Sequence, residues 1–191
     1  MASPWATPEE LRKHLRLPAI DEAAAAAAIA AAETIIRGEL RQDIDAVTDD
    51  TALLVGNGRR LLNLPQMPVT AVASVHQDGV LLTHGTDYRW NRFGILTRLG
   101  EPLWRGRLAG CWPLDADVTV VYSHGYPVVP AAVKQVCLQL AGRAWVRTST
   151  AVATESLGDR SIGYDKDRTG EELTAYELRL LEPYARGPES R

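Results

Sequence analysis

The chain has 191 residues, of which 46% are hydrophobic, and a formal net charge of −3 at pH 7. This length fits one globular domain, with or without an appendage. The near balance of 21 basic against 24 acidic residues gives no indication of broad binding to nucleic acid or anionic membranes. No apolar run is long enough to span a membrane and no signal-peptide pattern opens the sequence, so we expect synthesis in a cytoplasm-like compartment.

Two helices are predicted within residues 1–50. Thr7 and Glu10 form a capping box around Pro8, and Pro18 ends this first, short helix. Asp21 caps a longer, alanine-rich helix, which we prefer to a low-complexity interpretation because alanine has the highest helix propensity. The apolar line of the longer helix consists of Ile29, Ala32, Ile36 and Leu40.

The sequence pattern of residues 51–129 predicts short antiparallel strands separated by turns. The turn at Gly56-Asn57-Gly58 predicts a hairpin between residues 53–55 and 61–64. Further turns are expected at Asp78-Gly79 and Phe93-Gly94, which gives a small antiparallel sheet or half-barrel. In the strand after Pro68, one face should consist of Val69, Ala71, Ala73 and Val75.

The clearest stretch is a strand, a corner and a helix between Val118 and Trp145. The corner is His124-Gly125-Tyr126-Pro127, where glycine accepts positive φ and proline cannot donate to a ladder. Ser123 and His124 are adjacent on a strand and face opposite ways, so they form no dyad, and the ring of His124 should cap backbone groups. The helix after Pro130 has an apolar stripe of Val133, Val136, Cys137, Leu140, Ala141, Ala144 and Trp145. Cys137 should therefore be a reduced, buried thiol.

The loop Gly100–Asp117 contains Trp104 and Trp112 and has two interpretations. In the first, it folds back over the sheet, because large aromatic side chains often close small cores. In the second, it is an exposed apolar loop that packs against a neighbouring subunit. We take Trp104 and Trp112 as candidate interface residues.

Residues 148–191 are predicted to form an extended polar arm followed by a final helix. The arm has three spaced apolar anchors, Leu157, Ile162 and Tyr164, which we add to the candidate interface. Thr174 and Glu177 form a second capping box. The final helix should be lined by Tyr176, Leu180 and Tyr184. A polar arm of this kind is expected to bind a partner or, alternatively, to lie along its own subunit.

No catalytic, cofactor or metal site is predicted. The four histidines lie in four separate segments, and no phosphate-binding loop, dinucleotide motif or nucleophile elbow is present. Residues 165–170 loosely match the start of a calcium loop, but Tyr176 stands where a bidentate glutamate is needed. We therefore expect no enzyme and no metal.

These elements predict an α+β fold. It consists of about four helices in a small bundle, an inserted antiparallel β-rich segment and an extended C-terminal arm. The single domain 1–191 divides into N-terminal helices (1–50), the β-rich insertion (51–129), the central helix (130–147), and the arm with the C-terminal helix (148–191).

The order of several motifs along the chain is more informative than any one motif. They are T-P-E-E-L from Thr7, L-x-L-P-x-x-P-V-T-A-V-x-S-V from Leu62, Y-R-W-x-x-x-G-I-L from Tyr88, V-T-V-x-Y-x-H-G-Y-x-x-V-P-x-x-V from Val118, and E-S-L-G-D-x-S-I-x-Y from Glu155. In this order they resemble the head–tail connector proteins of long-tailed bacteriophages and prophages, also called adaptor or head-completion proteins. The resemblance covers residues 7–184 and departs in the longer loop Gly100–Asp117.

The resemblance implies an architectural role without a reaction or cofactor. Such proteins form a ring, commonly dodecameric, beneath the portal vertex of the filled head. They extend the DNA channel and provide the docking surface for the next connector or stopper protein. The implied partners are the portal protein, the stopper, further copies of this chain, and double-stranded DNA that passes without sequence-specific binding. The implied location is the head–tail interface of the virion, after synthesis in the cytoplasm of a bacterial host.

Two other function classes are compatible with the length and composition. One is a small enzyme or ligand-binding domain with its site in the β-rich segment, for which too few acids, bases or ligands converge. The other is a DNA-binding packaging subunit, which the missing basic face disfavours.

Overall fold

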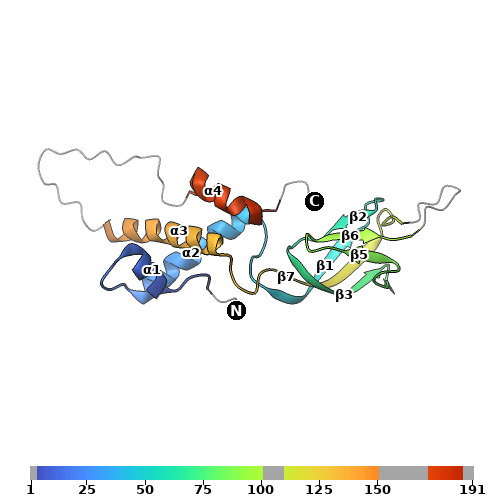
Figure 1. The fold of residues 1–191 in the computed structure, drawn as a ribbon, viewed down its shortest axis with the longest axis horizontal. Coiled ribbons are helices and arrows are strands. Elements are labelled where there is room, and N and C mark those ends of the chain that lie inside the picture. Colours follow the sequence, from blue (N-terminus) through green and yellow to red (C-terminus); the bar gives the residue numbers. More distant parts are fainter. Residues whose placement is uncertain (1–3, 101–109, 151–171, 187–191) are drawn as a thin grey trace, which may run out of the picture. The chain divides into compact units, whose positions relative to one another are not determined.

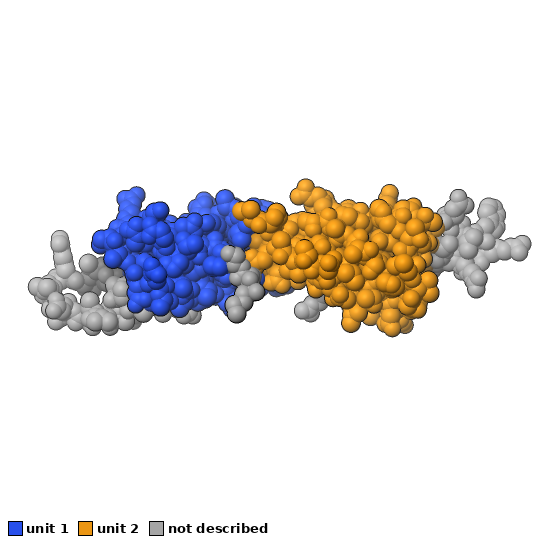
Figure 2. Space-filling model, turned by 90° about the horizontal axis from the view of Figure 1, so that it is seen from below, with its two compact units in different colours: residues 1–41, 129–185 blue, residues 42–128, 186–191 orange. Residues whose placement is uncertain are grey.

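The computed structural model describes residues 4–100, 110–150 and 172–186, and for residues 147–150 it describes the backbone only. Helices and antiparallel sheets are both present, which confirms the α+β class (Figure 1). The chain divides into two compact units, a helical unit of residues 1–41 and 129–185 and a β unit of residues 42–128 and 186–191 (Figure 2). No helix in the described ranges is long and apolar enough to cross a membrane.

The helical unit contains α1 (Pro8–Leu15), α2 (Glu22–Leu40), α3 (Ala131–Thr150), α4 (Ala175–Leu181) and a 3-10 turn, η1 (Glu182–Tyr184). The predicted helix starts are confirmed: Thr7 and Glu10 form a capping box, and Asp21 Oδ1 accepts from the Ala24 amide at 3.0 Å. α1 is joined to α3 by Lys134, whose Nζ lies 2.6 Å from Oε1 of Glu10.

The core of the helical unit is made by α3 and α2. The predicted stripe of α3 is buried from Val133 to Ala141, and Ala144 and Trp145 are half-buried. It faces a buried line of α2 that includes all four predicted residues, Ile29, Ala32, Ile36 and Leu40. Burial raises the pKa of the Cys137 thiol to about 12, so this cysteine is the inert, buried thiol that the stripe predicts.

α4 differs from the prediction in the face that it buries. Its capping box between Thr174 and Glu177 is confirmed, but the buried side chains are Glu177 and Leu181. Tyr176 is exposed, and Leu180 and Tyr184 are only half-buried. The carboxylate of Glu177 turns inward because Arg143 of α3 meets it there, which a pattern of apolar residues cannot reveal.

The β unit has two antiparallel sheets. In the larger, the strand order is β1 (Val47–Val55), β7 (Asp117–His124), β3 (Val69–Gln77) and β4 (Val80–Leu81). In the smaller, it is β2 (Leu61–Asn63), β6 (Ile95–Arg98) and β5 (Tyr88–Trp90). The turns at Asp78-Gly79 and Phe93-Gly94 join β3 to β4 and β5 to β6, as predicted. The core between the strands includes Val75, Leu96, Trp112, Val118, Val120 and Tyr122.

The predicted hairpin around Gly56 is wrong. β1 pairs with β7 and β2 pairs with β6, so the two strands belong to different sheets. The intervening turn is instead occupied by residues 112–116: Gly56 donates to the Ala116 carbonyl at 2.8 Å, and Gly58 donates to the Trp112 carbonyl at 2.9 Å. These long-range bonds replace those that a hairpin would form.

The predicted face of β3 is also wrong in part. Val69 and Val75 are buried, but Ala71 and Ala73 are exposed. The register with β7 shifts between Val69 and Ala71 and again between Val72 and Ser74. Each irregularity changes which side of the sheet the following side chains occupy, so simple alternation fails along this strand.

Candidate functional site

His124 and Asp50 form a polar pair in the β unit. His124 ends β7 and is 2% exposed, and its Nε2 lies 3.1 Å from Oδ2 of Asp50 on the neighbouring strand β1. The other carboxylate oxygen, Oδ1, accepts from the Thr51 amide at 2.8 Å. The expectation that the His124 ring caps backbone groups is therefore wrong, because one ring nitrogen meets a carboxylate and Nδ1 has no partner among the described residues.

Tyr122 lies beside this pair, with its ring centroid 5.1 Å from that of His124. Burial, and secondarily the charge of Asp50, raise the pKa of Tyr122 to about 12. Its hydroxyl lies near the backbone of Gln66 but makes no contact of hydrogen-bond geometry with a described residue. Arg186 donates from Nη1 to the carbonyl of Pro65 in the same region, and burial lowers the pKa of its guanidinium.

The chemistry of this cluster is structural. A catalytic His–Asp pair needs a nucleophile or a substrate proton within reach of the second ring nitrogen. The nearest hydroxyl in sequence, that of Ser123, points to the other face of β7 and accepts from the Asp49 amide at 3.3 Å. Within the described residues, the pair therefore ties β1 to β7 beside the register shift between Val47 and Asp50.

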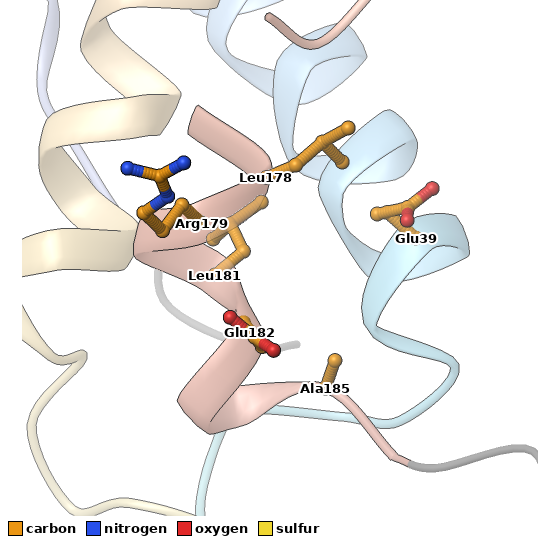
Figure 3. A pocket seen from close by; sticks show the side chains of 6 residues that line it. All are labelled: Glu39, Leu178, Arg179, Leu181, Glu182 and Ala185. Atoms are coloured by element: carbon orange, nitrogen blue, oxygen red, sulfur yellow. The ribbon is translucent and has the colours of Figure 1, made fainter. Parts of the chain in front are cut away.

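A second candidate is an open groove of about 360 Å³ in the helical unit, with Glu39 of α2 on one side and residues of α4 and η1 on the other (Figure 3). Its lining is Glu39, Leu178, Arg179, Leu181, Glu182 and Ala185. The volume is at the lower end for a small-molecule site, and the polar groups are carboxylates and one guanidinium without a nucleophile. We assign no reaction to it.

No metal centre is found in the part of the chain that the structure describes. No three His, Cys, Asp or Glu side chains there are grouped so that they could hold an ion. The calcium-loop pattern at residues 165–170 lies outside the described ranges.

Aliphatic side chains collect at the two outer strands of the larger sheet. The exposed fractions are 80% for Leu53, 59% for Val55, 65% for Val80, 62% for Leu81 and 70% for Leu114 in the turn before β7. Leu53 and Val55 lie on one edge strand, and Val80 and Leu81 lie on the opposite one, so each edge carries its own exposed aliphatic pair. Such edges are candidates for protein–protein contact. The sequence carries only a weak signal for part of this set: in the run Leu53-Leu54-Val55, a strand with one buried face must leave at least one residue outside, but the run does not say which.

Only one of the five predicted interface residues can be placed. Trp104, Leu157, Ile162 and Tyr164 lie outside the described residues. Trp112 is fully buried in the β-unit core, with the guanidinium carbon of Arg98 5.7 Å from its ring centroid. For Trp112 this favours the interpretation in which the loop folds back over the sheet. The subunit contact of Trp104 stays a prediction.

A scan against protein-family models and a search of curated proteins both find no match. Among solved structures, the fold is similar to chains of gene transfer agent particles. A chain from the neck of the empty particle, treated with C6 symmetry, is 18% identical with a TM-score of 0.52, and the match covers 98% of this chain and 93% of that one. A chain from the virion of the native particle is 17% identical with a TM-score of 0.53 and the same coverages, 98% and 93%.

A chain from the neck of the native particle, treated with C12 symmetry, is 17% identical, with a TM-score of 0.51 and coverages of 98% and 92%. At this identity the likeness shows a shared fold. It extends over nearly the whole of both chains, the two units included. At the level of the fold, it confirms the resemblance that the order of motifs predicts.

Proposed function

We propose that this chain is a head–tail connector of the adaptor type, a structural and non-enzymatic protein in the neck of a phage-like particle. The observation that carries the proposal is the fold, which matches neck chains over 98% of its length. The order of motifs in residues 7–184 supports the same assignment from the sequence. In this role residues 1–191 act as one connector domain, a small helical bundle into which the β unit is inserted.

The ring is the natural assembly for such a protein. Copies of the chain would form a dodecamer beneath the portal, extend the channel for double-stranded DNA and present a surface to the stopper protein. The C6 and C12 symmetries of the similar necks support a cyclic arrangement. The polar clusters of the chain support a structural role, because Asp50–His124 and Arg143–Glu177 each join two elements of one unit.

The sequence predicts a polar arm at Thr148–Gly170 which, with the terminal helix, would grip the portal. α3 extends to Thr150, and we further propose that the part of the arm beyond it contacts the portal. The alternative, a strap along the chain's own subunit, has support only for the helix that follows, since α4 is docked on α3 through Arg143 and Glu177. α4 therefore belongs to the body of the helical unit, and the portal contact is assigned to the polar segment with Leu157, Ile162 and Tyr164.

Electron microscopy of the purified chain mixed with its portal tests the function. We expect a ring of twelve copies seated on the portal. A variant in which a Gly/Ser linker of equal length replaces residues 151–171 keeps α4 and should remain folded by circular dichroism, yet fail to bind the portal. A wild-type chain that never decorates the portal would contradict the function, whereas a linker variant that still binds would contradict only the assignment of the arm.

A further inference from the structure

The larger sheet ends in two strands whose outer sides pair with no other described residue. The order β1-β7-β3-β4 places β1 and β4 at opposite edges. β1 has nine residues and pairs with β7 along one side, and β4 has two residues and pairs only with the end of β3. An unpaired edge presents backbone donors and acceptors that a further strand can satisfy.

The first half of β1 is protected against such pairing. Asp49 has φ of 53° and lies in the irregular stretch where the register shifts. The Thr51 amide is occupied by the carboxylate of Asp50. Acidic side chains and bulges of this kind are the means by which soluble proteins keep sheet edges from joining.

The second half of β1 has no such protection. Ala52 is buried and Leu54 partly buried against the core, so that Leu53 and Val55 point away from it. No charged residue lies between Thr51 and Gly56. The turn of residues 113–116, which contains the exposed Leu114, packs on Gly56 at the end of β1: the Asp115 amide donates to the Gly56 carbonyl at 3.0 Å. This end of the edge also carries a carboxylate, because Asp117 stands opposite Val55 in the register of β1 and β7.

The opposite edge is apolar as well. Val80 and Leu81 are both exposed, and no charge lies between Gly79 and Thr83. β4 is held to β3 by the pairs His76–Leu81 and Gln77–Val80 and is followed by a bond from the Leu82 amide to the Val75 carbonyl at 2.9 Å. Its outer side is thus a short, ordered strand edge with two aliphatic side chains.

We propose that the β1 edge of one copy, at residues 52–55, docks on the β4 edge of the next copy, so that the sheet continues from subunit to subunit around the ring. This inference rests on the ring proposed above. A cyclic ring requires two different surfaces on every copy that fit each other. Opposite edges of one sheet meet this requirement, since they are different, face away from each other, and here both carry exposed aliphatic side chains.

The test uses the full-length chain with one exposed residue changed at each edge, Leu53→Asp or Val80→Asp. Both side chains are largely exposed in the single chain, so folding by circular dichroism and the thermal midpoint should be unchanged. Sedimentation velocity over a concentration series should show assembly weakened at least about tenfold by either change, because a carboxylate would be buried in the contact. Phe93→Asp, at an equally exposed apolar residue in the β5–β6 turn, is the matched control and should assemble like the wild type.

Mixing the two variants identifies the geometry of the contact. Each variant alone has one intact edge and should stay monomeric, but together the intact β4 edge of L53D meets the intact β1 edge of V80D. The mixture should therefore form one-to-one dimers and no larger species. Amide hydrogen exchange should slow at residues 52–55 in the V80D partner on dimerisation. A two-fold contact between like edges would instead give homodimers of one variant alone and would overturn the inference.

If the wild-type chain assembles only on the portal, the same variants are imaged there. If L53D and V80D form rings as readily as wild type, the proposed edge contact is wrong, but the proposed ring is not contradicted. If the wild-type chain also forms rings in solution, variants that keep these rings but no longer bind the portal would assign the edge to the portal and would also overturn the edge contact. A wild-type chain that forms no ring in either setting overturns the proposed function itself, and the edge contact with it.

Discussion

At the scale of single residues, Glu177 holds the final helix in place. Its carboxylate is 2% exposed and receives two bonds from Arg143, Nη1 to Oε1 at 2.6 Å and Nη2 to Oε2 at 3.0 Å. Oε2 also accepts from the amide and the hydroxyl of Thr174. Burial by itself would raise the pKa of Glu177, but the bonds from Arg143 and Thr174 outweigh it and hold the pKa below its ordinary value.

Replacing Glu177 by glutamine should destabilise the chain. The change keeps the shape but removes the charge that Arg143 and the helix cap share, so we expect a loss of about 2 kcal/mol in the free energy of unfolding at pH 7. Urea denaturation measures it. Glu9→Gln is the control, because Glu9 makes its ion pairs with Arg12 and Lys13 at the surface and should matter little.

The difference in unfolding free energy between wild type and E177Q should also depend on pH, with a defined sign. A carboxylate whose pKa is lowered by folding stabilises the folded state above its unfolded pKa and loses this contribution as the pH falls through the folded value. The difference between wild type and E177Q should thus be full at neutral pH and shrink below about pH 4.5, the ordinary value for glutamate. A difference that stays constant from pH 7 to pH 3 would show that the carboxylate charge is not what stabilises α4.

At the scale of elements, the corner after β7 depends on Gly125. Its φ is +87°, and a Cβ there would lie 2.0 Å from the carbonyl oxygen of Asp45. Gly125→Ala should therefore cost about 2 kcal/mol or more. Gly79→Ala is the matched control, because it has a similar φ of +80° with nothing within 4 Å of the added carbon. Equal losses in the two variants by urea denaturation would mean that backbone conformation alone, and not the close approach to Asp45, is responsible.

Elements set by local chemistry could be predicted from the sequence, and those set by distant partners could not. The capped starts of α1, α2 and α4, the stripe of α3 and the positive φ of Gly125 all follow from neighbouring residues. The predicted β1–β2 hairpin failed because residues 112–116 compete for the turn at Gly56. The pairing of Asp50 with His124 joins residues 74 positions apart, so no spacing rule could find it.

At the scale of the whole molecule, the proposed channel sets a limit on DNA binding. Double-stranded DNA must slide through the ring, so we expect its inner surface to be neutral or acidic. The isolated chain, with a net charge of −3, should bind a 30-bp duplex more weakly than about 1 µM at physiological salt. Fluorescence anisotropy measures this, and a repeat at low salt shows whether any residual binding is electrostatic. Submicromolar affinity at physiological salt would contradict the channel role.

The residues of the proposed assembly surfaces are the ones that the sequence indicates least clearly. An interface residue has no partner within its own chain, so neither periodicity nor capping identifies it. Leu53 and Val80 become visible only when the sheet order places both on outer strands. The proposed ring would give these two different edges a use, which a single chain does not.

The chain enters the β unit near Ile44 and leaves it near Tyr126, and these two points lie side by side. At its two ends, the Tyr126 amide donates to the Ile44 carbonyl at 2.8 Å, and Asp45 and Tyr126 form an isolated bridge. A segment whose two ends are hydrogen-bonded to each other can vary in length between them without moving the elements on either side. Changes of loop length within residues 46–125 should therefore leave the path of the helices unchanged, because the two ends of the segment stay held together. The strands of both sheets all lie within residues 44–126, so the sheet pairing itself needs no residue from the C-terminal third of the chain, and from that third Arg186 adds a bond to the Pro65 carbonyl.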